Sequence, residues 1–200
     1  MSLDKINETS FIGIEGHIKI WDPESGDILV KRRNAINYEN MSIAIASLLA
    51  NESGNTGNHN IATMRFGNGG TTIDGLGVVT YKATNTNSAS GALYNQTFSQ
   101  AVDESVSGSA FNGTEISHTS PNTFTDVITT CTLNYGDVAG QDATDTATNM
   151  NGDYVFDELA IYSGNNDLLT HVVFHPVQKS ANRKIQVIYT LRIRSSFADL

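Results

Sequence analysis

The chain has 200 residues and a formal net charge of −9 at pH 7; 39% of its residues are hydrophobic and only 16% are charged, below the ~25% usual for soluble domains. A chain of this length can bury a sizeable core without disulfide or metal cross-links. Its single cysteine, Cys131, excludes an internal disulfide framework and cysteine-rich zinc modules. Because the chain has no long apolar run, we predict that it has no membrane-spanning helix and no signal peptide, and we expect synthesis in a reducing cytoplasm.

Two strands are predicted near the start of the chain. Residues 1–10 lack core character, and we expect them to form a flexible N-terminal arm. In residues 11–21 every even position from 12 to 20 is isoleucine or glycine, which is the alternation of a strand with one apolar face. A turn containing Pro and Gly follows at residues 22–27, and residues 28–33 complete a β-hairpin.

The next segment has the periodicity of a helix. Apolar residues recur at steps of three and four, which predicts a helix over residues 38–50 with Asn37 as its N-cap. The residues Asn51 to Gly54 end it. The expected apolar face consists of Tyr38, Met41, Ile45, Leu48 and Leu49.

The middle of the chain is rich in small polar residues. Ser, Thr, Asn and Gly occupy 51 of the 100 positions from 51 to 150. Short β-branched and aromatic runs within this region predict strands joined by long polar loops, including a surface excursion over residues 105–122. The predicted strands cover residues 61–66, 78–81, 93–98 and 125–133.

The last fifty residues are more regular. Strands are predicted at 154–162 and 168–174, joined by a turn, and after a connection over 175–182 a strictly alternating strand covers 184–194. The chain therefore has about eight or nine strands and one helix, with no alternation of strands and helices. We predict a mainly-β fold, an antiparallel β-sandwich of the jelly-roll type, formed by residues 11–200 as a single domain with loop insertions in 51–150.

Two sets of residues are predicted to shape the backbone. The segment Gly67–Gly70 lacks the Lys-Ser/Thr of a phosphate-binding loop and is interpreted as a turn at a strand end. We expect positive φ angles at Gly67, Gly69 and Gly70, which favour glycine. Pro176 is expected to fix the entry into the connection that precedes the last strand.

No group of residues predicts catalysis, a bound cofactor or a bound metal. His171 and His175 lie four apart on a predicted strand, and the neighbouring carboxylates Asp157 and Glu158 should point to opposite faces of their strand. Cys131 is expected to be a small buried side chain. The best calcium candidates are the loop carboxylates Asp142, Asp145 and Asp153, although no EF-hand or nonapeptide pattern supports them.

The charge is unevenly spread along the chain. Residues 51–150 contain nine acidic and only two basic side chains. The basic candidates for a nucleic-acid site are interpreted as solvent-facing strand residues, and the anionic surface argues against DNA or an anionic membrane as partner. These candidates are Lys31, Arg32, Arg33, Arg183, Lys184, Arg192 and Arg194.

Four structural motifs stand in a distinctive order between Ile28 and Ile193. They are Asn34-Ala35-Ile36 before the helix, Gly67-Asn68-Gly69-Gly70-Thr71, Glu158-Leu159-Ala160-Ile161-Tyr162 and Phe174-His175-Pro176-Val177-Gln178-Lys179. This order resembles that of virion structural proteins from tailed bacteriophages, over about three quarters of the chain. Ala160 stands where that pattern usually has Gly, and Tyr162 where it has Phe.

The resemblance implies a non-enzymatic virion component, made in the cytoplasm of a host bacterium. The first hypothesis is a homo-oligomeric decoration (cement) protein on the capsid surface, and the second is a neck, collar or tail-fibre adaptor. The expected partners are copies of the chain itself, as a trimer, and the major capsid protein or other virion proteins, without nucleic acid, membrane or cofactor. A third hypothesis, from a different class, is a carbohydrate-binding β-sandwich module whose acidic loops hold calcium.

Overall fold

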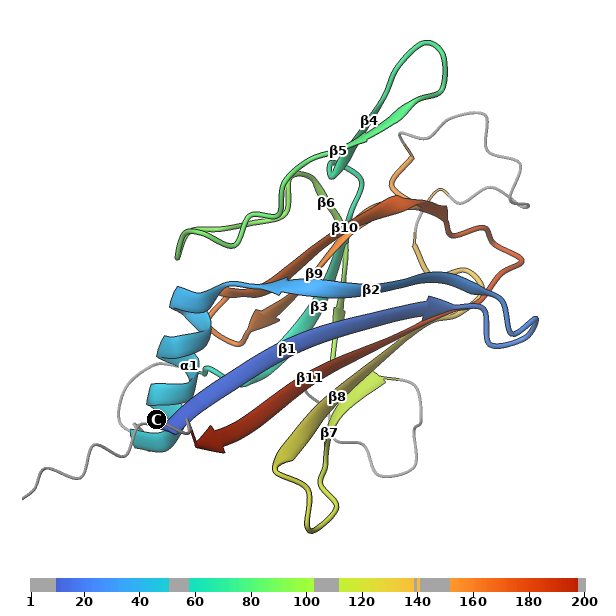
Figure 1. Ribbon diagram of the computed structural model, residues 1–200. Coiled ribbons are helices and arrows are strands. Elements are labelled where there is room, and N and C mark those ends of the chain that lie inside the picture. Colours follow the sequence, from blue (N-terminus) through green and yellow to red (C-terminus); the bar gives the residue numbers. More distant parts are fainter. Residues whose placement is uncertain (1–9, 51–57, 103–111, 139, 141–151, 198–200) are drawn as a thin grey trace, which may run out of the picture.

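The computed structural model describes residues 10–50, 58–102, 112–138, 140, 152–197, and it is mainly β (Figure 1). The predicted N-terminal arm lies outside these residues except for Ser10, which begins the first strand. One helix, α1 (Tyr38–Ala50), accompanies the strands within the described part of the chain. The strands are β1 (Ser10–Trp21), β2 (Ile28–Ile36), β3 (Ile61–Gly67), β4 (Thr71–Ile73), β5 (Val79–Tyr81), β6 (Gln96–Ala101), β7 (Asn112–Ser117), β8 (Phe124–Leu133), β9 (Val155–Ser163), β10 (Leu168–Gln178) and β11 (Ile185–Phe197).

Nine of these strands form one continuous antiparallel sheet, in the order β6-β3-β9-β10-β2-β1-β11-β8-β7. Strand β2 connects the two layers of the sandwich, because it pairs with β1 up to Asn34 and with β10 at Ala35 and Ile36. The outer strands of the sheet also approach each other, since the Thr114 hydroxyl of β7 donates to the carbonyl of Val102 beyond β6, at 2.8 Å. The antiparallel mainly-β prediction is confirmed, with both layers drawn from a single curled sheet.

The core lies between the two layers. Alternating residues of β11, from Ile185 to Leu191, are buried, as the sequence predicts for this strand. Phe66 and Phe156 pack against each other from the opposite layer, with ring centroids 4.9 Å apart. In β1 the even positions 16, 18 and 20 are buried, whereas Ile12 near the start of the strand is 60% exposed.

A loop covers the outer face of strands β9 and β10. Every residue of β9 is buried, which a strand with one solvent-facing side would not show. Leu93 of the loop between β5 and β6 packs with Ala160, Tyr162 and Leu168 in a second apolar cluster. The polar segment from Lys82 to Asn95 is therefore a packed cover on the sheet.

Helix α1 begins where the sequence predicts. The side chain of Asn37 accepts a hydrogen bond from the backbone N–H of Asn40 at 3.1 Å, so Asn37 is the N-cap. Of the predicted apolar face only Met41 is buried, together with Ala44, while Leu48 and Leu49 are 62% and 80% exposed. No described helix has the length and apolar character needed to cross a membrane.

Three predictions for the middle of the chain need correction. Residues 105–122 were expected to be a surface excursion, but β7 lies within them and pairs with β8 in register from Asn112 to Ser117. The predicted strand at 93–98 begins later, at Gln96, because Leu93 and Tyr94 belong to the covering loop. Strand β4 was not predicted, and it pairs only with β5.

Candidate functional site: an anchored hairpin arm

The most distinctive external feature is the hairpin of β4 and β5, residues 71–81, which we call the arm. It projects from the end of the sheet in Figure 1. A two-stranded hairpin of this size is only marginally stable by itself in water, so its base must be held by the rest of the fold. The contacts at that base explain how this is done.

The first anchor of the arm is the carboxylate of Asp157, which is 3% exposed in β9. One of its oxygens accepts the backbone N–H of Gly70 at 2.8 Å. The other accepts both the backbone N–H of Thr71 at 2.7 Å and its hydroxyl at 2.5 Å. Three donors therefore surround this buried charge, which is the condition under which burying a carboxylate is tolerated.

The second anchor is Glu158, which is fully buried. Its Oε1 accepts the backbone N–H groups of Asn95 at 2.8 Å and Gly69 at 3.2 Å. Its Oε2 accepts the backbone N–H of Tyr94 at 3.0 Å and lies 3.1 Å from Nε2 of His171. Burial acts to raise the pKa of Glu158, but the hydrogen bonds from His171 and the two backbone N–H groups outweigh it, so the pKa is lowered.

His171 completes this network. Its Nδ1 accepts the backbone N–H of Asn85 at 2.8 Å, so the ring proton is on Nε2 and is donated to Glu158. The histidine thus links the covering loop to the same carboxylate that holds the strand end at Gly69. The side chains of Glu158 and His171 are fully buried, and their hydrogen bonds fix two loops in place.

The glycines before the arm are required for a reason different from the one predicted. Positive φ angles occur among the described glycines at Gly26, Gly77, Gly136 and Gly140, so the prediction for Gly67, Gly69 and Gly70 is wrong. These three lie against the carboxylate anchors instead. A Cβ at Gly67 would overlap the carbonyl oxygen of Asn95 and lie 2.6 Å from Oε1 of Glu158. Side chains are excluded there because the backbone must approach the carboxylates closely.

Pro176 also has a different role from the one predicted. It lies inside β10, where the pairing with β9 shifts register between Val173 and Val177. A β-bulge is one of the few places in a sheet that tolerate proline, because no ladder hydrogen bond is lost there. The expected connection begins later, after Gln178.

The tip of the arm is a rigid turn. Asp74 accepts the backbone N–H groups of Leu76 and Val78 through Oδ1, at 2.8 and 2.9 Å, and its own N–H donates to the carbonyl of Val78. Gly77 has a φ of +83°, which a residue with a side chain rarely adopts. The backbone of the tip is therefore well defined although it is surrounded by solvent.

The arm presents apolar side chains to solvent. Leu76 is 91% exposed and Val78 57%, and Ile73 and Tyr81 are also about half exposed, at 41% and 48%. Exposed apolar side chains on a projecting element with a fixed backbone are typical of protein-binding surfaces, because little backbone conformational entropy is lost when they are covered. The arm thus fits contact with another protein surface.

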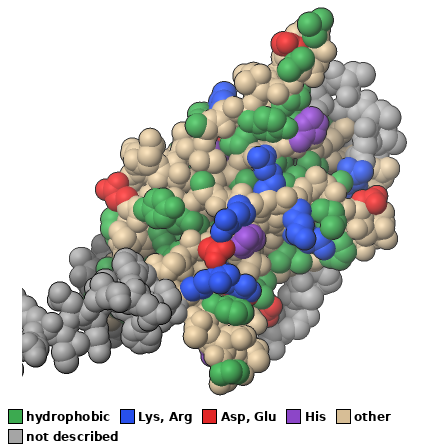
Figure 2. Space-filling view, in the orientation of Figure 1, with side chains coloured by type: hydrophobic (Ala, Val, Ile, Leu, Met, Phe, Trp, Pro, Cys, Tyr) green, Lys and Arg blue, Asp and Glu red, His purple; other side chains and the backbone are tan. Residues whose placement is uncertain are grey.

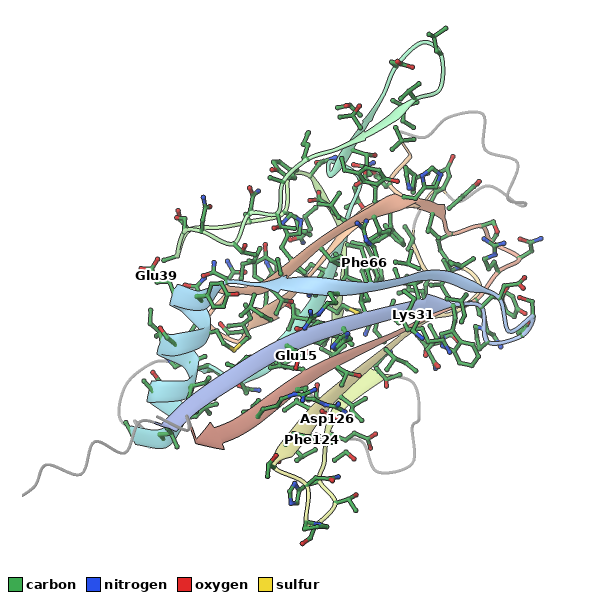
Figure 3. All side chains as sticks on the ribbon, viewed as in Figure 1. Glu15, Lys31, Glu39, Phe66, Phe124 and Asp126 are labelled. Carbon is green, nitrogen blue, oxygen red and sulfur yellow. The ribbon has the colours of Figure 1, made fainter. Side chains whose placement is uncertain are left out.

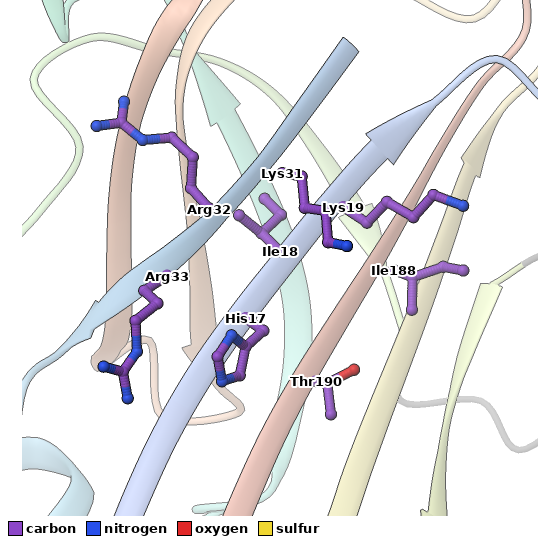
Figure 4. Close-up of a pocket in the computed structure, with 8 residues that line it drawn as sticks. All are labelled: His17, Ile18, Lys19, Lys31, Arg32, Arg33, Ile188 and Thr190. Atoms are coloured by element: carbon purple, nitrogen blue, oxygen red, sulfur yellow. The ribbon is translucent and has the colours of Figure 1, made fainter. Parts of the chain in front are cut away.

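A second candidate surface is the outer face of β2, β1 and β11. Blue side chains gather over these strands in Figure 2. A hollow of about 430 Å³ lies among them, and it has no acidic residue in its lining (Figure 4). We call it the basic groove, and it is lined by His17, Ile18, Lys19, Lys31, Arg32, Arg33, Ile188 and Thr190.

Asp126 and Glu15, two carboxylates close to these cations, are already paired. Asp126 of β8 forms a two-point ion pair with Arg192, with both N···O distances 2.7 Å, and this bond lowers the pKa of Asp126. Glu15 contacts Arg194 at 2.8 Å and Arg33 at 2.7 Å. Glu15, Lys31 and Asp126 are labelled in Figure 3. Positive charge is therefore in excess on this face.

The remaining sequence candidates are not brought together. Cys131 is fully buried, and burial raises the pKa of its thiol. His175 lies away from the buried His171 and contacts the Tyr81 hydroxyl at 3.3 Å. No group of three or more potential metal-binding side chains occurs within the described residues, and Asp142 and Asp145 lie outside them. Arg183 and Lys184 pair with Asp22 and Glu24 at the far end of the sheet.

The sequence contains only weak signals for the arm. Ile73-Asp74-Gly75-Leu76-Gly77-Val78 has the turn-forming Asp and Gly residues of a hairpin tip. The exposure of this hairpin tip depends on how β4 and β5 pair with each other and not with the main sheet, which the sequence does not reveal. No family model, curated protein or solved structure matches the chain.

Proposed function

We propose that the chain is a non-enzymatic structural protein of a tailed-phage virion, a homo-oligomeric decoration (cement) protein that binds the capsid surface. The motif order along the sequence supports the virion class. The observation that carries the protein-binding role is the arm, whose exposed Leu76 and Val78 are held on a rigid turn. A cement protein has to adhere without covalent chemistry to other protein surfaces of the particle, including further copies of itself, and such an arm supplies an apolar contact of that kind.

The anchoring of the arm supports the same role. Its base is tied to β9 through Asp157 and to the covering loop through Glu158. An arm that is already ordered loses less entropy on binding than a flexible loop would. Symmetric, multivalent attachment would then multiply weak individual contacts.

The proposal is tested by locating the protein in purified phage particles and counting its copies by quantitative mass spectrometry. Hundreds of copies per particle are expected for a decoration protein. A count of about 6 to 18 would support the alternative of a neck, collar or tail-fibre adaptor, since those positions have low-order cyclic symmetry. Absence from the particles would overturn the virion assignment.

A variant connects this experiment to the arm. Replacing residues 72–80 by a short Gly-containing turn removes the exposed apolar tip and leaves the Asp157 contacts to Gly70 and Thr71 in place. We expect this variant to fold but to be depleted from particles. A variant with Ile116→Ser, which alters an exposed apolar residue of β7, should be incorporated normally.

The carbohydrate-binding alternative has its own test. Two exposed tyrosines that could stack on a sugar are already engaged by cations, since Lys82 lies 4.6 Å above the ring of Tyr94 and Arg32 lies 5.7 Å from that of Tyr81. Tyr38, which is 78% exposed, is the remaining candidate for stacking among these side chains. A glycan array with and without chelator decides the matter. Sugar binding that is lost on chelation would overturn the proposed function.

A further inference from the structure

The basic groove contains an arrangement that costs stability in an isolated molecule. Lys19 of β1 and Lys31 of β2 stand directly opposite each other in the register of the two strands. Like charges in this position are destabilising. Within the described residues neither ammonium group contacts a carboxylate; Lys19 lies over the ring of Trp21 at 4.1 Å.

His17 and Arg33 lie opposite each other on the same strands and widen this positive surface. Arg32 instead donates to the carbonyl of Val173 at 2.7 Å. In Figure 4, Arg32 and Arg33 reach to one side of β2, whereas His17, Lys19 and Lys31 lie over β1. The side chains spread along the face instead of converging on one point, so a protein element that also makes apolar contacts fits this surface better than a single small anion. Ile188 and the aliphatic parts of the two lysines add apolar area to the hollow.

The arm has the complementary character. Asp74 is the only charged residue from Thr71 to Tyr81, and it stands two positions from the most exposed apolar side chain, Leu76. Its Oδ1 is occupied by backbone N–H groups of the tip. Its Oδ2 accepts no hydrogen bond within the described residues and is available to a cation. An acidic, apolar tip matches a groove with basic edges and an apolar floor.

We propose that the basic groove receives the arm of a second copy of this chain. The arm of a given molecule points away from the β1 and β11 face in Figure 1, so the contact has to be between molecules. Leu76 packs against Ile188 and the lysine stems, and Asp74 pairs with Lys19 or Lys31. The interface joins two different surfaces and is head-to-tail, so repeated contacts close into a ring at an appropriate rotation. This inference rests on the homo-oligomer of the proposed function and names its contact.

The test measures the association state of the purified protein by sedimentation velocity, at concentrations up to about 100 μM, where a micromolar contact is nearly saturated. We expect the wild type to associate, and both Leu76→Lys and Lys31→Glu to weaken association at least about tenfold, which corresponds to a loss of about 1.4 kcal/mol. Matched controls are Ile116→Lys on β7 and Lys184→Glu at the far end of the sheet, which should associate like the wild type. Unchanged circular dichroism and unfolding midpoints establish that all variants are folded.

Mixing the two defective variants identifies the geometry. Leu76→Lys retains an intact groove and Lys31→Glu retains an intact arm, so a head-to-tail contact predicts a 1:1 dimer that does not grow further. The double variant Asp74→Lys, Lys31→Glu exchanges the charges and should regain part of the association.

A monomeric wild type, unaltered association in both single variants, or a failure of the mixture to dimerise would each overturn the inference. If a monomeric wild type instead binds polyglutamate or single-stranded DNA through Lys31, another polyanion occupies the groove. Because these measurements use purified protein, their failure leaves the particle-location test of the proposed function unaffected.

Discussion

Glu158 shows how one residue can determine the position of several segments. Every group that contacts its two carboxylate oxygens is a hydrogen-bond donor. The donors are the backbone N–H groups of Gly69, Tyr94 and Asn95 and the imidazole of His171. The charge is the reason this works, because an ionised carboxylate can accept at both oxygens. Any neutral replacement has to leave part of the donor set unsatisfied.

The first prediction concerns Glu158→Gln. The side-chain amide can accept at its oxygen, but its NH2 group would face two donors, so we expect a loss of about 2–4 kcal/mol in unfolding free energy, measured by urea denaturation. Glu115→Gln, on the exposed strand β7, is the control and should change stability by less than about 0.5 kcal/mol. An equal effect of the two substitutions would contradict the anchoring role.

The pH dependence of stability gives a second test of the same residue. The pKa of Glu158 is lowered in the folded protein from an ordinary value of 4.5, so its ionisation stabilises the fold above that pH, and the stabilisation is lost as the pH falls through the folded pKa. The stability difference between wild type and Glu158→Gln should therefore be largest above pH 5 and shrink in more acidic solution. A difference that stays constant down to pH 3 would argue against it.

Cys131 provides a chemical probe of the core. Its side chain is fully buried and burial raises the pKa of the thiol, so the reactive thiolate form is suppressed. We expect no reaction with an aromatic disulfide reagent in the native protein and stoichiometric reaction after denaturation in urea. Rapid modification under native conditions would show that this part of β8 opens readily.

At the scale of elements, the pattern of apolar residues in the sequence predicts the strands that carry a continuous apolar face. It does not predict strands that lack such a face and are ordered only by hydrogen bonds to a neighbouring strand. Strands β8 and β11 agree with the prediction within a few residues because β-branched residues alternate along them. Strand β9 agrees because it is rich in apolar and aromatic residues on both faces. Strand β7, with the sequence NGTEIS, has no such pattern and is ordered by its ladder with β8.

The candidate site was harder to predict, for a related reason. Asp157 and Glu158 are adjacent in sequence, but their backbone N–H partners lie more than 60 residues earlier in the chain. Such partnerships depend on the path of the chain across the sheet, which a pattern of local residues does not contain. The glycines at 67, 69 and 70 could be recognised as special, whereas the carboxylates that make them necessary could not.

A substitution tests this relation between element and anchor. Gly67→Ala places a Cβ against Asn95 and Glu158, and we expect it to destabilise the protein by about 1–3 kcal/mol, the usual cost of overpacking. Gly75→Ala in the arm, where a Cβ meets no atom within 4 Å, is the matched control and should be neutral. Thermal unfolding of both variants measures the difference, and a neutral Gly67→Ala would show that the strand end can move away from its anchor.

At the scale of the whole molecule, burial is concentrated on one side of the sandwich. Strand β9 is buried over its entire length, and β10 is buried from Leu168 to Phe174. The layer that contains β1 and β11 instead exposes a charged outer face. The molecule thus has a rigid, covered half and a half whose outer surface is open to partners.

This asymmetry predicts a gradient in amide hydrogen exchange. The backbone N–H groups of β9 and β10 should exchange most slowly, at rates that approach those of global unfolding, and those of β4 and β5 most rapidly among the strands. Exchange measured by mass spectrometry of peptic fragments can resolve these segments. Equal protection of the arm and of β9 in dilute solution would indicate that the arm is already covered by another copy.

The closure of the arm at its base has a consequence for how this protein could diversify. The backbone N–H of Lys82 donates to the carbonyl of Gly70 at 2.9 Å, so the chain leaves and re-enters the fold at nearly the same point. Residues 72–80 can therefore be exchanged for another hairpin without altering the path of any strand in the nine-stranded sheet. Changes in the tip of the arm can therefore alter the choice of partner, while the carboxylates of Asp157 and Glu158 hold the base of the arm in the same position.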